Sequence, residues 1–303
     1  MKTARYAFPL LGLVIFSLLL ALTGCQSQPG AEGQVEAPAA SADAYIQNKG
    51  SDTIVNLALA WAEAYQLAHP EVRISVTGGG SGTGIASLMN GTVDIANASR
   101  AITQEEIATA QRQGIDPQEI VIARDAIAVI VHPSNPVQQM TLEQVSRIYN
   151  GEYTNWKELG GEDRPIVRVS RETNSGTHVY FLEEVVRLGQ EDNHTIFSPD
   201  TLLLPSSEGI ISEVSDNPNA IGYDGLGYVT PHVKMVAIAS PGTQNFVLPS
   251  VDTVNDGSYP ISRELFMYID KDPDPTVQAY LDYILSAEAQ EVVTSLGFVP
   301  VIR

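Results

Sequence analysis

The chain has 303 residues, of which 44% are hydrophobic and 17% are charged. Its length is about twice that of an ordinary domain and its apolar content suffices for a core, so we expect two globular domains or one large one. The 36 acidic and 17 basic residues give a formal net charge of -19, which excludes nucleic-acid binding as the main role. One cysteine and five scattered histidines give no metal-ligand spacing, so we expect no metal and no cofactor.

The first 25 residues have the pattern of a secretory signal. Lys2 and Arg5 precede an apolar run at 8–22, and the Leu-Thr-Gly-Cys sequence that closes the run resembles a bacterial lipobox. The run is shorter than the ~20 residues that span a membrane, which argues against an uncleaved anchor. We therefore expect residues 1–24 to be a signal peptide, Cys25 to carry the lipid (palmitate included), and residues 25–44 to form a flexible tether. The predicted location is extracytoplasmic, anchored to a bacterial membrane through Cys25.

Beyond the tether, short apolar runs alternate with stretches of helical periodicity. The clearest helix is predicted at 53–68, where apolar residues such as Leu57 and Trp61 recur on one face. Strands that alternate with helices of this kind indicate an α/β fold with mostly parallel sheets. The predicted strands lie at 72–76, 126–131, 166–169, 220–223, 233–238 and 265–269. The further predicted helices lie at 82–89, 104–113, 142–149, 175–188, 275–285 and 288–296.

Three segments place small hydroxyl residues at the start of a predicted helix. They read Lys-Gly-Ser-Asp-Thr at 49–53, Gly-Gly-Gly-Ser-Gly-Thr-Gly at 78–84 and Ser-Arg-Glu-Thr-Asn-Ser-Gly-Thr at 170–177. The first backbone N–H groups of a helix lack intrahelical partners and carry the positive end of the helix dipole, so they favour a compact oxyanion. Glycine lets the backbone approach closely, and Ser or Thr hydroxyls add donors. Together the segments predict an oxyanion site.

Each segment has another interpretation. Ser, Thr and Asp at helix starts are ordinary caps, although three such segments in one exported chain favour binding. The glycine-rich segment lacks the lysine of a nucleotide-binding P-loop. Ser81 is flanked by glycines as in a nucleophile elbow, but Thr83 occupies the final glycine position and no histidine has a recognisable place as its base. A serine esterase or phosphatase therefore remains the weaker alternative.

In chain order, these segments occur together with 97–100 (Asn-Ala-Ser-Arg), 132–137 (His-Pro-Ser-Asn-Pro-Val), 148–151 (Ile-Tyr-Asn-Gly) and 297–300 (Gly-Phe-Val-Pro). The combination resembles the PstS-type phosphate-binding lipoproteins of bacterial phosphate ABC transporters, from about residue 45 to the C-terminus. The resemblance implies a two-lobed type II periplasmic-binding-protein fold, with mixed sheets flanked by helices and two crossing strands as the hinge. Lobe 1 would comprise 45–127 plus 262–303, and lobe 2 would comprise 128–261. The crossing strands would lie at 126–131 and near 261–269.

The resemblance also implies which residues bind phosphate. Arg171 would be the charge partner of the anion. Some family members have an aspartate, which accepts the phosphate proton, where this chain reads Ser-Arg at 99–100, so Arg100 becomes a candidate second cation and Asp125 the candidate proton acceptor. Arg100 could instead be a surface residue or a partner of Asp94. Asp125 could instead be a cap or pair with Arg124 or another nearby residue. The remaining implied ligands are Ser51, Thr53, Ser81, Gly82, Ser175, Gly176 and Thr177.

The resulting hypothesis is a monomeric receptor, not an enzyme, that captures inorganic phosphate in the cleft between the lobes. Its partner would be the membrane permease of a phosphate ABC transporter. Sulfate, molybdate and tungstate are tetrahedral anions that fit the same donors, so they remain alternative ligands. An adhesion or sensor module with a protein-binding face is the other alternative.

Overall fold

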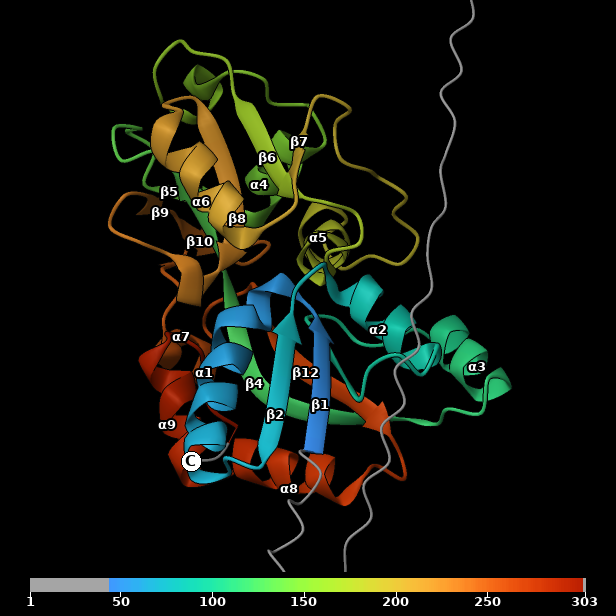
Figure 1. Cartoon of the computed structure of the whole chain (residues 1–303). Coiled ribbons are helices and arrows are strands. Elements are labelled where there is room, and N and C mark those ends of the chain that lie inside the picture. The colour runs from blue at the N-terminus through green and yellow to red at the C-terminus, as the bar shows by residue number, and fades with distance from the viewer. Residues whose placement is uncertain (1–43, 302–303) are drawn as a thin grey trace, which may run out of the picture. The chain divides into compact units, whose positions relative to one another are not determined.

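A computed structural model gives the structure of residues 44–301 (Figure 1). The predicted signal peptide, Cys25 and the tether up to residue 43 lie outside these residues. Between residues 44 and 301, no helix combines the length and the apolarity that crossing a membrane requires. In the same range, no three His, Cys, Asp or Glu side chains are grouped as a metal ion would need.

Helices and strands alternate along most of the described chain. The helices are α1 (Asp52–Ala68), α2 (Ser81–Met89), α3 (Gln104–Arg112), α4 (Leu142–Tyr149), α5 (Gly176–Phe181), α6 (Ser207–Asp216), α7 (Val251–Asn255), α8 (Pro275–Ile284) and α9 (Ala287–Ser295). The strands are β1 (Ala44–Gly50), β2 (Val72–Thr77), β3 (Ile95–Ala98), β4 (Pro117–Val131), β5 (Gln139–Thr141), β6 (Val167–Arg171), β7 (Leu202–Leu204), β8 (Ala220–Gly225), β9 (Lys234–Met235), β10 (Ala237–Ala239), β11 (Phe246–Val247) and β12 (Ser262–Asp270).

Most of these strands form one mixed sheet, in the order β2-β1-β3-β12-β4-β8-β6-β7, with β9 beside β4. The pairs β1–β2, β1–β3, β6–β7 and β6–β8 are parallel. The pairs β12–β3, β12–β4 and β4–β8 are antiparallel. The predicted α/β class with mixed sheets flanked by helices is therefore confirmed. A smaller sheet has the order β11-β10-β5.

The long strand β4 lies inside the sheet and runs from its first part into its second, as Figure 1 shows. Its residues 117–126 pair with β12, and its residues 127–131 pair with β8. The N–H of Ile127 donates to the carbonyl of Ile261 at 2.8 Å, so the segment that leads into β12 lies beside β4 at the changeover. The two crossing strands are therefore present, and β4 begins at Pro117 rather than at 126 because its first residues pair along the whole length of β12.

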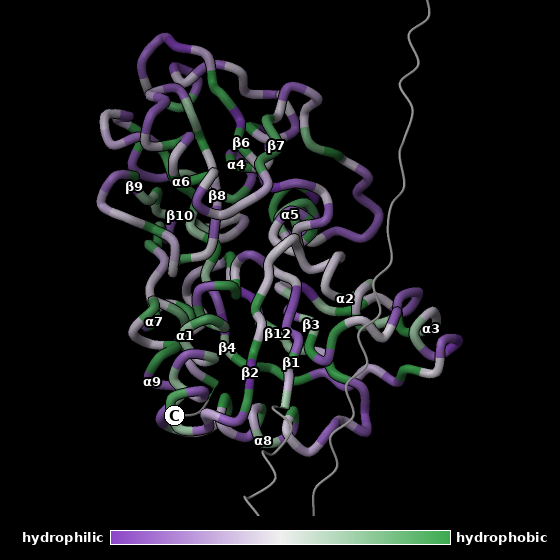
Figure 2. Tube along the Cα trace, in the orientation of Figure 1, coloured by the Kyte–Doolittle hydropathy of each residue, from purple (hydrophilic) through white to green (hydrophobic). Residues whose placement is uncertain are grey.

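Two large apolar cores lie on either side of this changeover. One contains Trp61 and Tyr280, with α1, α8 and α9 around it, and the other contains Tyr149 and Phe181. We call β1, β2, β3, β12 and α1, α2, α3, α8, α9 the first half, and β5 to β11 with α4 to α7 the second half. The predicted lobe boundaries, after 127 and after 261, lie where these halves join, and the lobes as separate domains stay a prediction. Hydrophilic residues occupy many of the outer loops of the second half (Figure 2).

Two predicted elements differ from the structure, and some observed elements were not predicted. The predicted helix at 175–188 is α5 followed by a π-helical turn at Leu182–Val186. The predicted strand at 233–238 is two short strands, because β9 pairs with β4 whereas β10 pairs with β5 in the smaller sheet. The pattern of apolar residues did not predict α6, β1 or β3, whose sequences carry few large apolar side chains.

Candidate anion-binding site

The starts of α1, α2 and α5 meet in the middle of the molecule. Ser51 stands at the cap position of α1 but its side chain makes no cap hydrogen bond. Gly80, with φ of 88°, precedes α2, which also begins without a side-chain cap. Only Ser175, before α5, accepts a hydrogen bond as a cap, from the N–H of Thr177 at 3.2 Å. Ordinary capping therefore does not account for the hydroxyls of the first two segments.

The serine hydroxyls of the first half bond one another instead. Ser51 Oγ donates to Ser99 Oγ at 2.9 Å. Ser81 Oγ lies 3.2 Å from Ser99 Oγ and accepts the N–H of Ser99 at 3.0 Å. All three residues are buried, with exposed fractions of 2% or less. A compact set of polar oxygens is thus held away from solvent.

The second half contributes through the start of α5. Thr177 Oγ1 lies 2.9 Å from Thr53 Oγ1, so the two threonines share a hydrogen bond across the halves. The carbonyl of Asn174 accepts the N–H of Gly82 at 3.1 Å. A Cβ on Gly176 would lie 2.4 Å from Ser81 Oγ, which is too close for any side chain. We call Ser51, Thr53, Ser81, Ser99 and Thr177 the hydroxyl cluster.

Arg263, from β12, is the cation in contact with this cluster, and the sequence analysis did not identify it. Its Nη1 donates to the carbonyl of Ser99 at 2.8 Å, and its Nη2 donates to Thr177 Oγ1 at 2.9 Å. Its side chain is only 3% exposed, and its guanidinium lies 5.4 Å from the ring centroid of Tyr180. The available signal was an arginine inside the predicted crossing segment at 261–269, where a charge needs a partner.

Asp125 contacts Arg263 and is fully buried. Its Oδ2 accepts from Arg263 Nη2 at 3.3 Å, and its Oδ1 accepts the N–H of Leu226 at 3.2 Å. Burial raises the pKa of Asp125 to about 6; Arg263 opposes the rise, and the nearby carboxylate of Asp224 adds to it. Its partner is therefore Arg263 rather than Arg124, whose Nη2 donates to Asn255 Oδ1 at 2.6 Å.

Arg171 lies beside the cluster in a different set of contacts. Its Nη2 donates to Asp52 Oδ2 at 2.7 Å and to the carbonyl of Pro205 at 2.8 Å. Its Nη1 donates to Ser207 Oγ at 3.0 Å and lies 4.0 Å from Asp224 Oδ2. Burial raises the pKa of Asp224, and Arg171 opposes that rise. Arg171 therefore joins β6 of the second half to α1 of the first.

Arg100 makes a two-pronged ion pair with Glu106, at 2.6 and 2.8 Å. This hydrogen-bonded pairing raises the pKa of Arg100. Asp94, the partner considered from the sequence, instead accepts the N–H of Gln47 at 2.8 Å. Anion contact by Arg100 stays a prediction.

The structure thus assembles most of the residues that the sequence singled out. Those in or directly bonded to the hydroxyl cluster and its arginine are Ser51, Thr53, Ser81, Asp125, Ser175 and Thr177. Gly176 lies against Ser81, and Gly82 follows Ser81 in the chain and donates its N–H to the carbonyl of Asn174. Hydroxyls, helix starts and one arginine supply the donors that a small oxyanion needs. None of the hydrogen bonds in the described residues links Ser51, Ser81 or Ser175 to a histidine, so the nucleophile–base pair of a serine hydrolase is not formed there.

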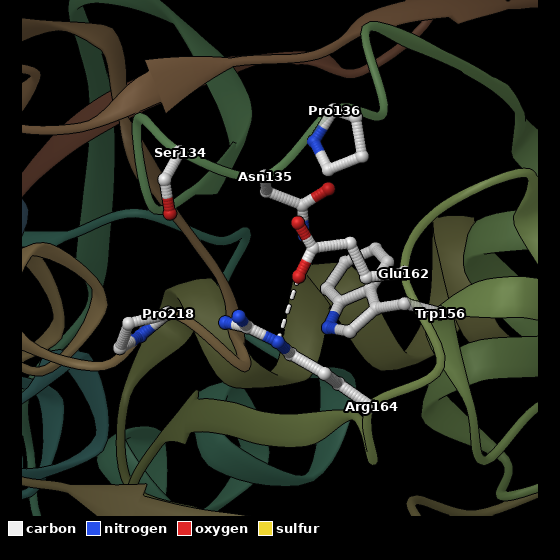
Figure 3. Close-up of a pocket in the computed structure, with 7 residues that line it drawn as sticks. All are labelled: Ser134, Asn135, Pro136, Trp156, Glu162, Arg164 and Pro218. Carbon is white, nitrogen blue, oxygen red and sulfur yellow. Dashed lines mark ion pairs between the residues drawn. The ribbon is translucent and has the colours of Figure 1, made fainter.

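A small hollow in the second half, shown in Figure 3, lies among other residues. Its volume is about 10 Å³, which is room for about one water molecule. The ion pair beside it joins Arg164 and Glu162 at 2.7 Å. The hollow shares no lining residue with the hydroxyl cluster and is too small for a tetrahedral anion. Its lining residues are Ser134, Asn135, Pro136, Trp156, Glu162, Arg164 and Pro218.

Known proteins share both the sequence and the fold. Residues 36–288 match the PBP superfamily domain. The phosphate-binding protein PstS of Pseudomonas aeruginosa is 34% identical over 272 residues, covering 84% of this chain and 82% of that protein. PstS of Bacillus subtilis is 31% identical over 256 residues, covering 83% and 79%.

Solved structures show the same similarity to phosphate-binding proteins. A putative phosphate ABC transporter substrate-binding protein with bound phosphate, from Clostridium perfringens, is 35% identical, with a TM-score of 0.75, over 85% of this chain and 99% of that one. An ABC-type phosphate transport receptor from Vibrio cholerae is 29% identical, with a TM-score of 0.67, over 84% and 99%. The chain therefore belongs to the PBP superfamily and, within it, to the family of the PstS proteins. The resemblance inferred from the sequence motifs is confirmed.

Proposed function

We propose that the protein captures inorganic phosphate between its two halves and delivers it to the permease of an ABC transporter. The observation that carries this proposal is the buried hydroxyl cluster, contributed by three helix starts and in contact with Arg263. Relatives named for phosphate binding and phosphate transport support the same ligand.

The proposed binding mode uses groups that both halves contribute. A hydroxyl that bonds another hydroxyl can rotate and donate to an anion instead. Ser51, Thr53 and Ser81 would donate from the first half, together with the N–H of Gly82, which would exchange the carbonyl of Asn174 for the anion. Ser175, Gly176 and Thr177 would bind from the start of α5. Because the shell is complete only when the halves approach, phosphate would favour the closed arrangement of the two predicted lobes.

Asp125 would supply selectivity. Monohydrogen phosphate carries a proton that needs an acceptor, whereas sulfate at neutral pH has none to give. A carboxylate beside the arginine would accept a hydrogen bond from that proton and would repel an anion that lacks one. Its burial and its contact with Arg263 support this role.

The proposal includes the setting of the protein. The lipobox at Cys25 supports a lipid anchor on the outer side of a bacterial membrane. The protein would act there as a monomeric receptor that releases phosphate unchanged, without turnover or cofactor.

Calorimetric titration of the chain from residue 26 onward tests the proposal. Phosphate should bind with one site per chain, and sulfate, molybdate and tungstate should bind at least about tenfold more weakly. If one of those anions bound more tightly than phosphate, that anion would be the ligand instead. Release of chromophore from a chromogenic phosphate ester, under conditions that saturate the site, would point to an enzyme.

A further inference from the structure

The motif at 297–300, which the sequence analysis singled out, has no place in the hydroxyl cluster. It follows α9, and Phe298 and Val299 are 1% and 0% exposed. Phe298 packs in the core that contains Trp61, whereas Val299 packs in the core that contains Tyr149. The motif therefore lies where the two halves join.

Val299 is bonded to the residue that precedes Asp125. The N–H of Arg124 donates to the carbonyl of Val299 at 2.8 Å, and the N–H of Val299 donates to the carbonyl of Arg124 at 2.9 Å. At the same point β4 is paired with β12, which places Asp125 opposite Arg263. The backbone of β4 beside Asp125 is therefore held from both edges, by β12 and by the motif.

Phe298 reaches the carboxylate of Asp125 from another side, through the short helical turn that follows β8. Gly227 lies in this turn, and a Cβ there would lie 2.6 Å from the carbonyl oxygen of Leu296 and 2.8 Å from the ring of Phe298. The N–H of Leu226, one residue earlier, donates to Asp125 Oδ1 at 3.2 Å. Because the turn is pressed against the end of α9, that helix end and the ring set where this N–H points.

Two further contacts fix the turn. Gly297 ends α9 with φ of 80°, and a Cβ on it would lie 3.3 Å from the Cα of Gly227. Tyr228 closes the turn, and its hydroxyl donates to the carbonyl of Asp52, at the start of α1, at 2.6 Å. The turn is thus held between the motif, the start of α1 and Asp125.

Asp125 depends on the turn because a buried carboxylate needs hydrogen-bond donors. Among the described residues its oxygens accept from Arg263 Nη2 and from the N–H of Leu226. Arg263 also donates to the hydroxyl cluster, at Thr177 Oγ1, whereas the N–H of Leu226 serves Asp125. By binding Oδ1, Leu226 leaves Oδ2 on the side of the arginine.

Resting on the proposed role of Asp125 in phosphate selectivity, we propose that the motif at 297–300 is a positioning element for this carboxylate. Phe298 holds the turn whose N–H binds Asp125 Oδ1, and Val299 holds the backbone of the preceding residue. The motif lies outside the hydroxyl cluster, so it acts on the choice of anion through Asp125.

The first test is Gly227→Ala, which adds a methyl group where there is no room and so displaces the turn. In calorimetric titrations, the ratio of phosphate to sulfate affinity should fall at least about fivefold, because a lost hydrogen bond to a charged group changes affinity by about tenfold or more. Gly222→Ala in β8 is the control. Its Cβ would lie 2.7 Å from Val214 Cγ2, so it should cost stability and keep the affinity ratio.

The second test places Gly227→Ala in an Asp125→Asn background. If the turn acts through the carboxylate, the substitution should leave the phosphate-to-sulfate ratio of Asp125→Asn unchanged, since the two residues are then coupled. An equal fall of the ratio in both backgrounds would overturn the proposal, because the turn would reach the site by another route.

The third test needs no anion. The hydrogen bond from Leu226 lowers the pKa of Asp125, so Gly227→Ala and Phe298→Leu should both raise this pKa above about 6 in an NMR titration of the carboxyl carbon. Arg263 and Asp224, the other charged groups that act on Asp125, stay in place in both variants. Leu281→Ala, which opens a cavity in the same core as Phe298, is the control for lost stability and should leave the pKa unchanged.

The outcomes separate this inference from the proposed function. An unchanged pKa of Asp125 in Gly227→Ala and Phe298→Leu, with a native chain that prefers phosphate, would overturn the positioning role alone. A native chain that binds phosphate and sulfate equally would overturn the selectivity role of Asp125. In that case the motif would still be shown to position the carboxylate if the pKa rises in both variants.

Discussion

The helices that begin at the hydroxyl cluster and the helices that begin elsewhere use the same residue types in different ways. Away from the cluster, Thr103 and Thr141 form complete capping boxes at α3 and α4. At the cluster, α1 and α2 begin without any side-chain cap, whereas α5 is capped by Ser175. A hydroxyl cap stabilises a helix by about 1 kcal/mol.

Thr103 and Thr141 therefore serve helix stability, whereas Ser51, at the cap position of α1, gives up that stabilisation. Ser51 turns its hydroxyl to Ser99 instead. Ser81, which follows Gly80 at the cap position of α2, also bonds Ser99. Departures from local rules of this kind concentrate at functional sites. The distinction can be tested at single residues.

The largest expected effect is at Asp125, because a buried carboxylate lowers the stability of the fold at neutral pH. The pKa of this carboxyl is raised by burial from 3.8 to about 6, with Arg263 opposing and Asp224 adding to the rise. The stabilisation provided by the protonated form is complete below about pH 4 and is lost as the pH rises through about 6. A shift of about two pH units corresponds to on the order of 3 kcal/mol. Thermal melts without phosphate should show the native chain losing stability relative to Asp125→Asn between pH 4 and pH 7.

An exposed carboxyl provides the matched control for this pH series. A hydrogen bond from Ser258 lowers the pKa of Asp256, so the native chain should lose stability relative to Asp256→Asn as the pH falls, the opposite sign. A difference between native and Asp125→Asn melts that stays constant from pH 4 to pH 7 would show that the pKa of Asp125 is not raised.

The next largest effect is expected at Gly176. Overpacking costs about 1–3 kcal/mol, and a methyl group there would press on Ser81 Oγ, so Gly176→Ala should weaken phosphate binding about 5- to 150-fold. Gly209→Ala in α6 is the control, because its added Cβ would only reach ordinary contact at 3.4 Å from Ser206 Oγ. Calorimetry on both variants decides the point, and equal affinities would mean that the start of α5 does not face the ligand.

The smallest effects make the sharpest contrast between the two groups of hydroxyls. Thr141→Ala should lower the free energy of unfolding by about 1 kcal/mol and leave phosphate affinity unchanged. Ser51→Ala should lower phosphate affinity about 2- to 10-fold, with a smaller loss of stability, because it removes a donor and no cap. Urea unfolding and calorimetry on both variants give the comparison. Ser51 would be an ordinary cap if its variant behaved like Thr141→Ala in both measurements.

Short sequence patterns predicted those parts of the site whose residues are close together in the chain. The three hydroxyl-bearing helix starts could be recognised because glycine and hydroxyl residues before a helix have a short-range cause. Arg263 could not be recognised in the same way, since it meets Asp125 from 138 positions away along the chain, through the pairing of β12 with β4. The partner of Arg171 was equally hidden, because Asp52 lies 119 positions away.

The elements of the fold also divide into those that local sequence patterns predict and those that they do not. Helix α1 was predicted because its apolar residues recur at helical spacing and are buried. Strand β1 was not, because Gln47, Asn48 and Lys49 are polar, although β1 occupies an interior place between β2 and β3. Its position in the sheet, rather than its side chains, makes it a strand.

The place of β12 in the sheet has a consequence for how the nascent chain matures. β12 lies between β3 and the first part of β4, although both of those strands are synthesised long before residues 262–270. Until the ribosome has completed β12, the backbone groups at 117–126 have no strand partner in the first half of the native sheet. Unpaired strand edges invite pairing with other chains. A product truncated before residue 262 would therefore be a substrate for aggregation and chaperone capture, even though its second half would have all of its own strands.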